Sequence, residues 1–251
     1  MGEKNMNEFW YTSQTMRAIK GETFRSFELL SPTHLFWLGM TLLAIIWAFV
    51  WFKKQSAETK TKAFRILTIL LLADEIFKYV VTLATGQFEW QFLPFHLCSI
   101  NLFVCLWNTL HPNTTAKEIL YTICIPAALI AMLTPAWMPL PIANFMHLHS
   151  ATVHIMLLLY PIMLLADGFR PNIKNIGKVL VFLVCAALLA TGLNAMWGTN
   201  FMFLSRTDNN PMLNLVANVF GKFYVLGMGL LVVVVLIIMY LPWVLPSKKK
   251  A

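Results

Sequence analysis

Residues 230–239 read LLVVVVLIIM, and no charged residue occurs between Lys222 and Lys248. A run of about 20 apolar residues makes a helix long enough to cross the hydrocarbon core of a bilayer. Similar runs recur along the 251-residue chain, which is 59% hydrophobic and only 12% charged, whereas soluble proteins carry about 25% charged residues. No alternation typical of strands is present. We therefore expect an all-α, polytopic membrane protein, because a helix satisfies its own backbone in lipid.

Turn residues and charged loops divide these runs into seven predicted membrane spans. Residues 1–30 combine charged and aromatic side chains and lack the residue order of a cleaved signal, so we expect a short helix at the membrane interface. The membrane domain covers 31–245, and a basic tail covers 246–251. The spans are predicted at 34–52, 64–85, 92–110, 117–134, 146–166, 176–197 and 213–242.

The distribution of lysine and arginine predicts the orientation of the bundle. Basic residues concentrate in the loops after the first, third and fifth spans and in the C-terminal tail. The opposite loops carry only Arg206, although the N-terminal segment is also basic. This predicts an outer N-terminus and a cytoplasmic C-terminus. The cytoplasmic set is Lys53, Lys54, Lys60, Lys62, Arg65, Lys117, Arg170, Lys174, Lys178, Lys248, Lys249 and Lys250.

The net charge of +8 does not indicate nucleic-acid binding, because the basic residues lie in short loops that set orientation and contact anionic lipid. The cysteines all fall within apolar spans, and their spacing matches neither a disulfide framework nor a zinc site. They are Cys98, Cys105, Cys124 and Cys185. We expect no metal and no cofactor. The sequence leaves the oligomeric state open.

Most histidines fall in the predicted outer half of the bundle, and Cys98 lies among them in the first turns of the third span. These histidines are His34, His96, His147, His149 and His154. An ionisable group in hydrocarbon costs a few kcal/mol unless it finds a partner, so this grouping predicts a site. By helical spacing Cys98 and Asn101 share one stripe, and His147 shares another with His154, while His149 points elsewhere.

Cys98 is the candidate nucleophile. A helix N-terminus and a nearby imidazole both favour the thiolate form of cysteine, and His96 precedes Cys98 by two residues. His154 is the first candidate for the base and His147 the second. The alternatives are an inert buried cysteine and histidines that only hydrogen-bond between helices. A three-histidine zinc hydrolase is a further alternative, although the last span lacks a histidine.

Other polar residues in the spans receive structural or orienting roles. Asp74 and Lys78 are four residues apart, which predicts a structural intramembrane ion pair and leaves Glu75 to bond a neighbouring span. Asn214, Asn218 and Lys222 are predicted on one face of the last span. The candidate residues for binding or orienting a substrate are His34, Asn101, His149, Asn194, Asn200 and Lys222.

Four segments also carry a resemblance to a known family. They are FELLSPTHL at 27–35, LPFHLCS at 93–99, the histidine-rich fifth span and GTNFMFL at 198–204. In order and spacing, over roughly residues 24–240, they resemble the YwaF-type bacterial integral membrane proteins. That family extends to an animal transmembrane acyltransferase that acts on ether phospholipids. The segment after Pro211 matches least well.

The resemblance implies transfer of a fatty acyl chain between phospholipids or lysolipids, with a cysteine nucleophile and a histidine partner. By position these are Cys98 and His154, with His147 next. We therefore predict a membrane-embedded lipid acyltransferase whose site lies in the outer leaflet. The alternatives are a lipid ester hydrolase at the same site and a non-enzymatic lipid- or peptide-binding protein whose histidines sense pH.

Overall fold

The computed structural model describes residues 8–208 and 210–245, and the regular elements of this part are all helical: α-helices, short 3₁₀ turns and one π-helical turn, joined by loops. The first seven residues of the predicted interfacial segment and the predicted tail 246–251 lie outside the described residues. The helices are α1 (Ser13–Lys20), α2 (Pro32–Lys53), α3 (Ala57–Ala84), α4 (Leu97–Leu110), α5 (Thr114–Ile119), α6 (Ile125–Leu133), α7 (Phe145–Ala166), α8 (Ile176–Trp197), α9 (Pro211–Phe220) and α10 (Tyr224–Val244).

The predicted class of polytopic α-helical membrane protein is confirmed. Within the described residues, six stretches are long and apolar enough to cross a membrane. They are Pro32–Lys53, Trp90–Leu110, Thr114–Leu133, Phe145–Ala166, Ile173–Trp197 and Pro211–Val244. The second predicted span corresponds to α3, whose 28 residues include charged side chains and which is not among the six. A total of seven spans and their orientation stay predictions.

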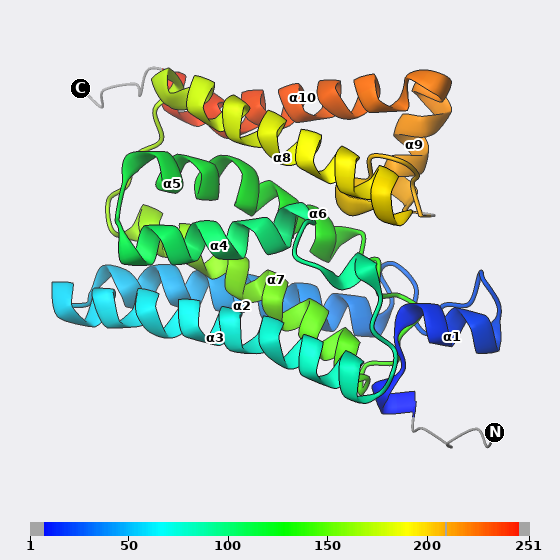
Figure 1. Ribbon diagram of the computed structural model, residues 1–251. Coiled ribbons are helices and arrows are strands. Elements are labelled where there is room, and N and C mark those ends of the chain that lie inside the picture. Colours follow the sequence, from blue (N-terminus) through cyan, green and yellow to red (C-terminus); the bar gives the residue numbers. More distant parts are fainter. Residues whose placement is uncertain (1–7, 209, 246–251) are drawn as a thin grey trace.

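Helix α7 occupies the centre of the bundle and packs against α2, α3, α4 and α6. In Figure 1 it crosses behind α3 and α4, while α8 and α10 lie on the far side of α5. The main apolar core joins side chains of all these helices and of the turn before α6, and it includes Leu71, Leu102, Ile123 and Leu157. Large apolar side chains on α2, α8 and α10 remain exposed, as expected of surfaces that face lipid.

The starts of two central helices follow their sequence signals. Ser31 caps α2, accepting from the backbone N–H of His34 at 3.5 Å, and Pro32 takes the first helical position, as predicted. Asn144 caps α7 by accepting from the N–H of His147 at 3.1 Å. Its amide nitrogen also donates to the carbonyl oxygens of Glu8 and Tyr11. The cap of α7 therefore also holds the N-terminal segment.

Two predicted spans are not continuous α-helices. The fourth contains a π-helical turn, Leu120–Cys124, directly before α6; such turns are rare and frequently accompany functional sites. The seventh, predicted at 213–242, is broken between α9 and α10, which cross at a steep angle in Figure 1. Gly221, with φ +51°, permits this break.

The break corrects one sequence prediction. Lys222 lies in the turn between α9 and α10, so it does not share a helix face with Asn214 and Asn218. Gly227 of α10 allows α9 to fold back closely, because a Cβ added there would lie 2.5 Å from the ring of Phe220. At about 1.5 Å per residue, the 21 residues of α10 are long enough to cross the hydrocarbon core alone.

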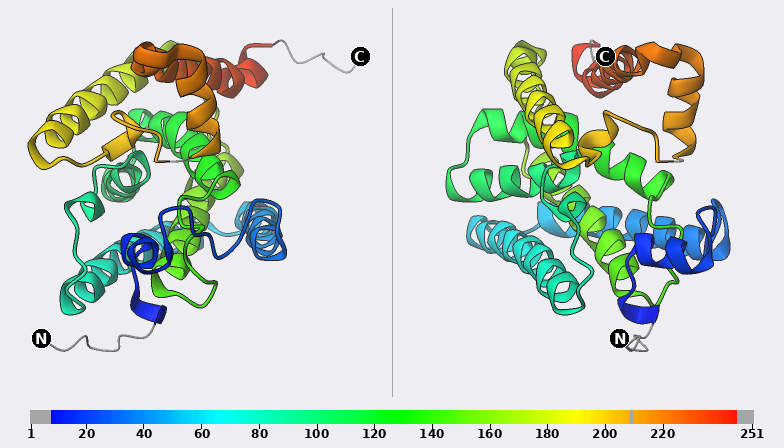
Figure 2. Two further views of the ribbon diagram at one scale, coloured as in Figure 1. Left: turned by 90° about the vertical axis from the view of Figure 1, so that its right-hand side faces the viewer. Right: turned by 45° about the vertical axis from the view of Figure 1, so that its right-hand side comes forward.

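The N-terminal segment packs across one end of the bundle. It contains the predicted short helix, α1, whose Met16 is fully buried. The N–H of Thr12 donates to Gln87 Oε1 at 3.1 Å, and the N–H of Ser26 donates to the Met138 carbonyl oxygen at 2.8 Å. Figure 2 shows α1 at the same end as the start of α7 and the end of α3. This segment therefore covers the end where the histidines gather.

Candidate functional site

The segment that leads into α4 is held against the loop that follows α8. Gln91 Oε1 accepts from the backbone N–H of Asn200 at 2.8 Å, and Gln91 Nε2 lies 2.8 Å from His96 Nε2. The His96 ring packs against Phe201 and Phe203, with ring centroids 5.3 and 5.6 Å apart. Two segments that carry the family resemblance, 93–99 and 198–204, are therefore in direct contact.

Two asparagines organise that loop. Asn194 Oδ1 accepts from the N–H of Phe201 at 2.7 Å, and its Nδ2 donates to the Phe201 carbonyl oxygen at 3.1 Å. Asn200 Nδ2 donates to Asp208 Oδ2 at 2.8 Å and to the Arg206 carbonyl oxygen at 2.8 Å. The side-chain amides of Asn194 and Asn200, which were predicted to orient a substrate, thus bond groups of the loop itself.

The loop holds consecutive residues in a strained conformation. Met202 and Phe203 have φ values of +57° and +55°, in the left-handed region that side chains other than glycine rarely adopt. Strain of this kind persists only where surrounding contacts enforce it, and it clusters at functional sites. Here the contacts of Asn194, Asn200 and His96 enforce it.

Cys98 lies in the first turn of α4, where the N-cap residue His96 makes no side-chain capping bond. Its side chain packs against the apolar core, which includes Val153 and Leu157 of α7. The predicted stripe is confirmed as an inward face, because Asn101 is fully buried. Asn101 Nδ2 donates to the Leu97 carbonyl oxygen at 2.9 Å, whereas its Oδ1 has no hydrogen-bond partner among the described residues.

His154 has one ring nitrogen bonded to its own helix. Its Nδ1 lies 2.6 Å from the Ser150 carbonyl oxygen, which can only accept, so in the neutral ring Nδ1 carries the proton. The lone pair is then on Nε2. The ring stacks on Trp137, with centroids 5.3 Å apart and planes inclined by 20°. Val153, the residue before it, belongs to the core cluster that Cys98 contacts, so α4 and α7 meet at this level.

His147 and His34 have other surroundings. His147 is fully buried between Phe27 and Trp37, and its Nδ1 lies 2.9 Å from the Leu140 carbonyl oxygen. In His34, Nδ1 accepts from the N–H of Leu30 and Nε2 donates to the Met132 carbonyl oxygen, both at 2.9 Å. Nε2 thus links α2 to the end of α6, and Nδ1 holds the turn before α2. A role of His34 in substrate binding stays a prediction.

The predicted pair of Asp74 with Lys78 is also wrong. Lys78 Nζ instead lies 2.6 Å from Glu75 Oε1 and donates to the Phe92 carbonyl oxygen at 3.0 Å. The Phe92 carbonyl lies in the segment leading to α4, so this hydrogen bond holds the Lys78 ammonium group at that segment. Asp74 Oδ2 lies 2.8 Å from His149 Nδ1 on α7. His149 therefore pairs with α3, and nothing in its contacts orients a substrate.

Lys222 is not on a helix face. Its side chain is exposed in the turn after α9, with Nζ 5.2 Å from the centroid of the Phe223 ring. In the part of the chain that the structure describes, no three His, Cys, Asp or Glu side chains are grouped so that they could hold a metal ion.

Sequence analysis overlooked Gln91 and Glu118. Gln91 joins His96 to the loop after α8, and glutamine in a polar turn gives no distinctive signal.

Glu118 is fully buried. Its Oε1 accepts from the N–H of Asn172 at 2.8 Å and from Asn175 Nδ2 at 3.0 Å, and its Oε2 accepts from the Tyr240 hydroxyl at 3.0 Å. A single carboxylate in an apolar span was a usable signal.

Glu89 lies just before the Trp90–Leu110 span and links it to the N-terminal segment. Thr12 Oγ1 donates to Glu89 Oε1 at 3.4 Å. Burial raises the pKa of the Glu89 carboxyl above its usual range, and the hydrogen bond from Thr12 offsets part of that rise. The neutral form of Glu89 is therefore favoured where α1 packs on the bundle.

The sequence model of the TMEM164 family matches residues 29–240. The chain belongs to the TMEM164 family. This match spans the four segments noted above except for the first two residues of the earliest. Membership supports a multi-pass membrane protein of this family, and the bacterial YwaF-type assignment stays a prediction. No curated protein and no solved structure matches the chain.

Proposed function

We propose that the chain is a lipid acyltransferase in which Cys98 is the nucleophile and His154 the base. The observation that carries the proposal is the position of Cys98. It stands in the first turn of a helix that lacks a side-chain cap, and it packs into the core cluster that contains Val153, next to His154. Membership of the TMEM164 family agrees with this role, although it names no activity.

The first half-reaction follows from these groups. His154 Nε2 accepts the thiol proton, and Cys98 Sγ attacks the ester carbonyl carbon of an acyl lipid. The oxyanion that forms accepts hydrogen bonds from backbone N–H groups in the first turn of α4, which the cap leaves available. Collapse breaks the ester C–O bond, and the imidazolium returns its proton to the departing lysolipid oxygen. The acyl chain is then a thioester on Cys98.

The second half-reaction reverses the roles. His154 takes a proton from the hydroxyl group of an acceptor lysolipid, whose oxygen attacks the thioester carbonyl. The C–S bond breaks, and the thiolate regains the proton from the imidazolium. Apolar walls from α4, the π-helical turn and α7 surround Cys98 and favour lipid over water as the acceptor.

The test measures transfer by the purified full-length protein. Labelled acyl phospholipid and a lysolipid acceptor are supplied, and intact-mass analysis follows acyl addition to Cys98. We expect Cys98→Ala and His154→Ala to abolish both adduct and product. Cys185→Ala is the matched control, because Cys185 is exposed on α8. Transfer that survives in folded Cys98→Ala protein would refute the proposal.

The hydrolase alternative uses the same groups and differs only in the acceptor. Labelled free fatty acid, formed with no acylated lysolipid and still dependent on Cys98, would identify it. The pH-sensing alternative is favoured by one observation, the 2.8 Å approach of His149 to Asp74 between α7 and α3. It predicts no acyl adduct and a ligand affinity whose pH dependence is lost in Asp74→Asn.

A further inference from the structure

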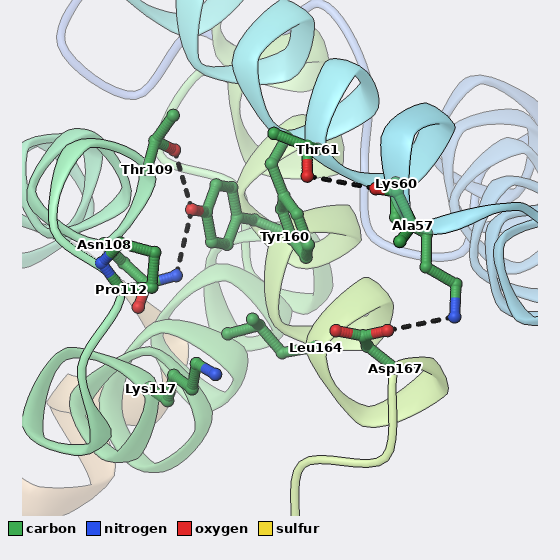
Figure 3. A pocket seen from close by; sticks show the side chains of 11 residues that line it. Ala57, Lys60, Thr61, Asn108, Thr109, Pro112, Lys117, Tyr160, Leu164 and Asp167 are labelled. Atoms are coloured by element: carbon green, nitrogen blue, oxygen red, sulfur yellow. Dashed lines mark hydrogen bonds and ion pairs between the residues drawn. The ribbon is translucent and has the colours of Figure 1, made fainter.

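A cavity of about 290 Å³ opens at the end of the bundle opposite to the histidines. It lies where α3 begins and where α4 and α7 end. Figure 3 shows side chains from these helices and from α5 converging on it. The residues that the argument uses are Lys60, Phe64, Asn108, Lys117, Tyr160 and Asp167.

A chain of hydroxyl groups forms one wall of the cavity. Asn108 Nδ2 donates to the Tyr160 hydroxyl oxygen at 3.1 Å, which lies 2.7 Å from Thr109 Oγ1. Thr109 Oγ1 is in turn 2.8 Å from Thr68 Oγ1. The Tyr160 side chain is fully buried, so this chain of hydrogen bonds fixes the wall of the cavity and leaves the lysines as the donors that a ligand can reach.

Two lysines and one carboxylate give the lining an excess of positive charge. Lys60 Nζ lies 3.0 Å from Asp167 Oδ1. Lys117 forms no salt bridge with any described residue, and in Figure 3 its side chain extends toward Leu164 and Tyr160. An ammonium group that lines a cavity and has no acidic partner is complementary to an oxyanion.

We propose that this cavity binds the phosphate oxyanion of an acidic phospholipid. Lys117 contacts the phosphate, and the apolar walls formed by Phe64 and Leu164 accommodate the lipid beyond it. The surrounding loops hold most of the basic residues, so anionic lipid concentrates at this end, and basic pockets between membrane helices are known to bind lipid headgroups. The site is separate from Cys98 and does not depend on the proposed acyl transfer.

The test measures which lipids the full-length protein retains. The protein is placed in nanodiscs of phosphatidylcholine with or without phosphatidic acid, and native mass spectrometry counts bound lipids. We expect selective retention of phosphatidic acid and about a 10-fold loss of affinity in Lys117→Gln. Lys117→Arg should restore retention. Lys62→Gln is the control, because Lys62 lies on the same end, exposed and paired with Glu58.

Free phosphate offers the same chemistry, so it forms a second arm. A rise in thermal midpoint with inorganic phosphate that needs Lys117, without lipid retention, would support the oxyanion site with a soluble ligand. If Lys117→Gln fails to fold, Lys117→Met, which keeps an unbranched side chain without the charge, replaces it. Equal retention in wild type and the folded variants, with no phosphate effect, would overturn the proposal. Cys98→Ala should retain lipid as wild type does.

Discussion

The two ends of α7 bury polar groups in different ways. At the end where α7 begins, called the outer end after its predicted orientation, each histidine has a partner from a different place: His147 bonds the Leu140 carbonyl, His149 lies against Asp74, and His154 bonds the Ser150 carbonyl of its own helix. At the opposite end, called the inner end in the same sense, Tyr160 belongs to one continuous chain that crosses α3, α4 and α7. The outer end therefore consists of separate contacts, and the inner end is a coupled network.

This difference predicts how many properties of the protein a single substitution changes at each end. Groups with independent partners are expected to change one property each, because contacts without shared partners are additive. Groups in a shared network change together, since removing one leaves others without a partner. At the histidine end, neighbouring residues can thus have separate roles. At the cavity end, each hydrogen bond depends on the other residues of the network.

The largest effect should separate His154 from His147. We expect His154→Gln to slow acyl transfer roughly 10²–10⁴-fold, the range for loss of a general base, with little change in thermal midpoint. His147→Gln should do the opposite, because its ring fills the space between Phe27 and Trp37. Transfer assays and thermal unfolding in one detergent measure both. Loss of acyl transfer with unchanged stability in His147→Gln would contradict the expected difference between His147 and His154.

At the inner end, Glu118→Gln should reduce stability by about 1–3 kcal/mol. The amide keeps the volume of the side chain but turns an N–H group toward donors that now bond a carboxylate, from Asn172, Asn175 and Tyr240. Reversible unfolding of the purified protein gives the free energy. The folded fraction should transfer acyl chains at the normal rate, and a variant as stable as wild type would show that Glu118 is dispensable.

A smaller effect tests the coupling itself. Tyr160→Phe and Asn108→Ala should each cost about 1 kcal/mol, and the double variant should depart from additivity by about 0.5 kcal/mol or more. The same double-variant cycle on His147 and His149 should be additive, because the polar contacts described for these two side chains involve different partners. Additive behaviour at both ends would contradict the description of the inner end as a network.

The smallest effect concerns pH at the outer end. Because burial raises the pKa of Glu89, its contribution to the packing of α1 is complete below the carboxyl's usual pKa. That contribution is lost as pH rises through the raised pKa. Hydrogen exchange in α1, corrected for the intrinsic pH dependence, should therefore increase over that window. Glu89→Gln should exchange slowly at every pH, and an unchanged pH profile in this variant would exclude Glu89 as the cause.

Much of the fold could be predicted from local sequence. Apolar length identified the spans, Ser31 and Pro32 marked the start of α2, and the spacing of Cys98 and Asn101 predicted an inward face. These features depend on residues within a few turns of each other. The break at Gly221 was missed because the flanking segments are both apolar, and only the packing of α9 against Gly227 distinguishes two helices from one.

Partner choice in the candidate site could not be predicted in the same way. Helical spacing predicted that Asp74 pairs with Lys78. In the bundle, however, Lys78 contacts Glu75 and the Phe92 carbonyl, and Asp74 contacts His149. His34 looked like the other outer histidines in sequence, but α6 places a carbonyl against its ring.

By itself the sequence determined that this chain is a helical membrane protein with a cysteine and several histidines near one end. Hydrophobic length and helical period act locally and need no partner. Only the tertiary structure decided which partner each of these histidines meets. It also decided that the lysines of the other end converge on a cavity. The physical reason is that hydrogen bonds and ion pairs form within about 3 Å, and residues distant in sequence meet at that range only through packing.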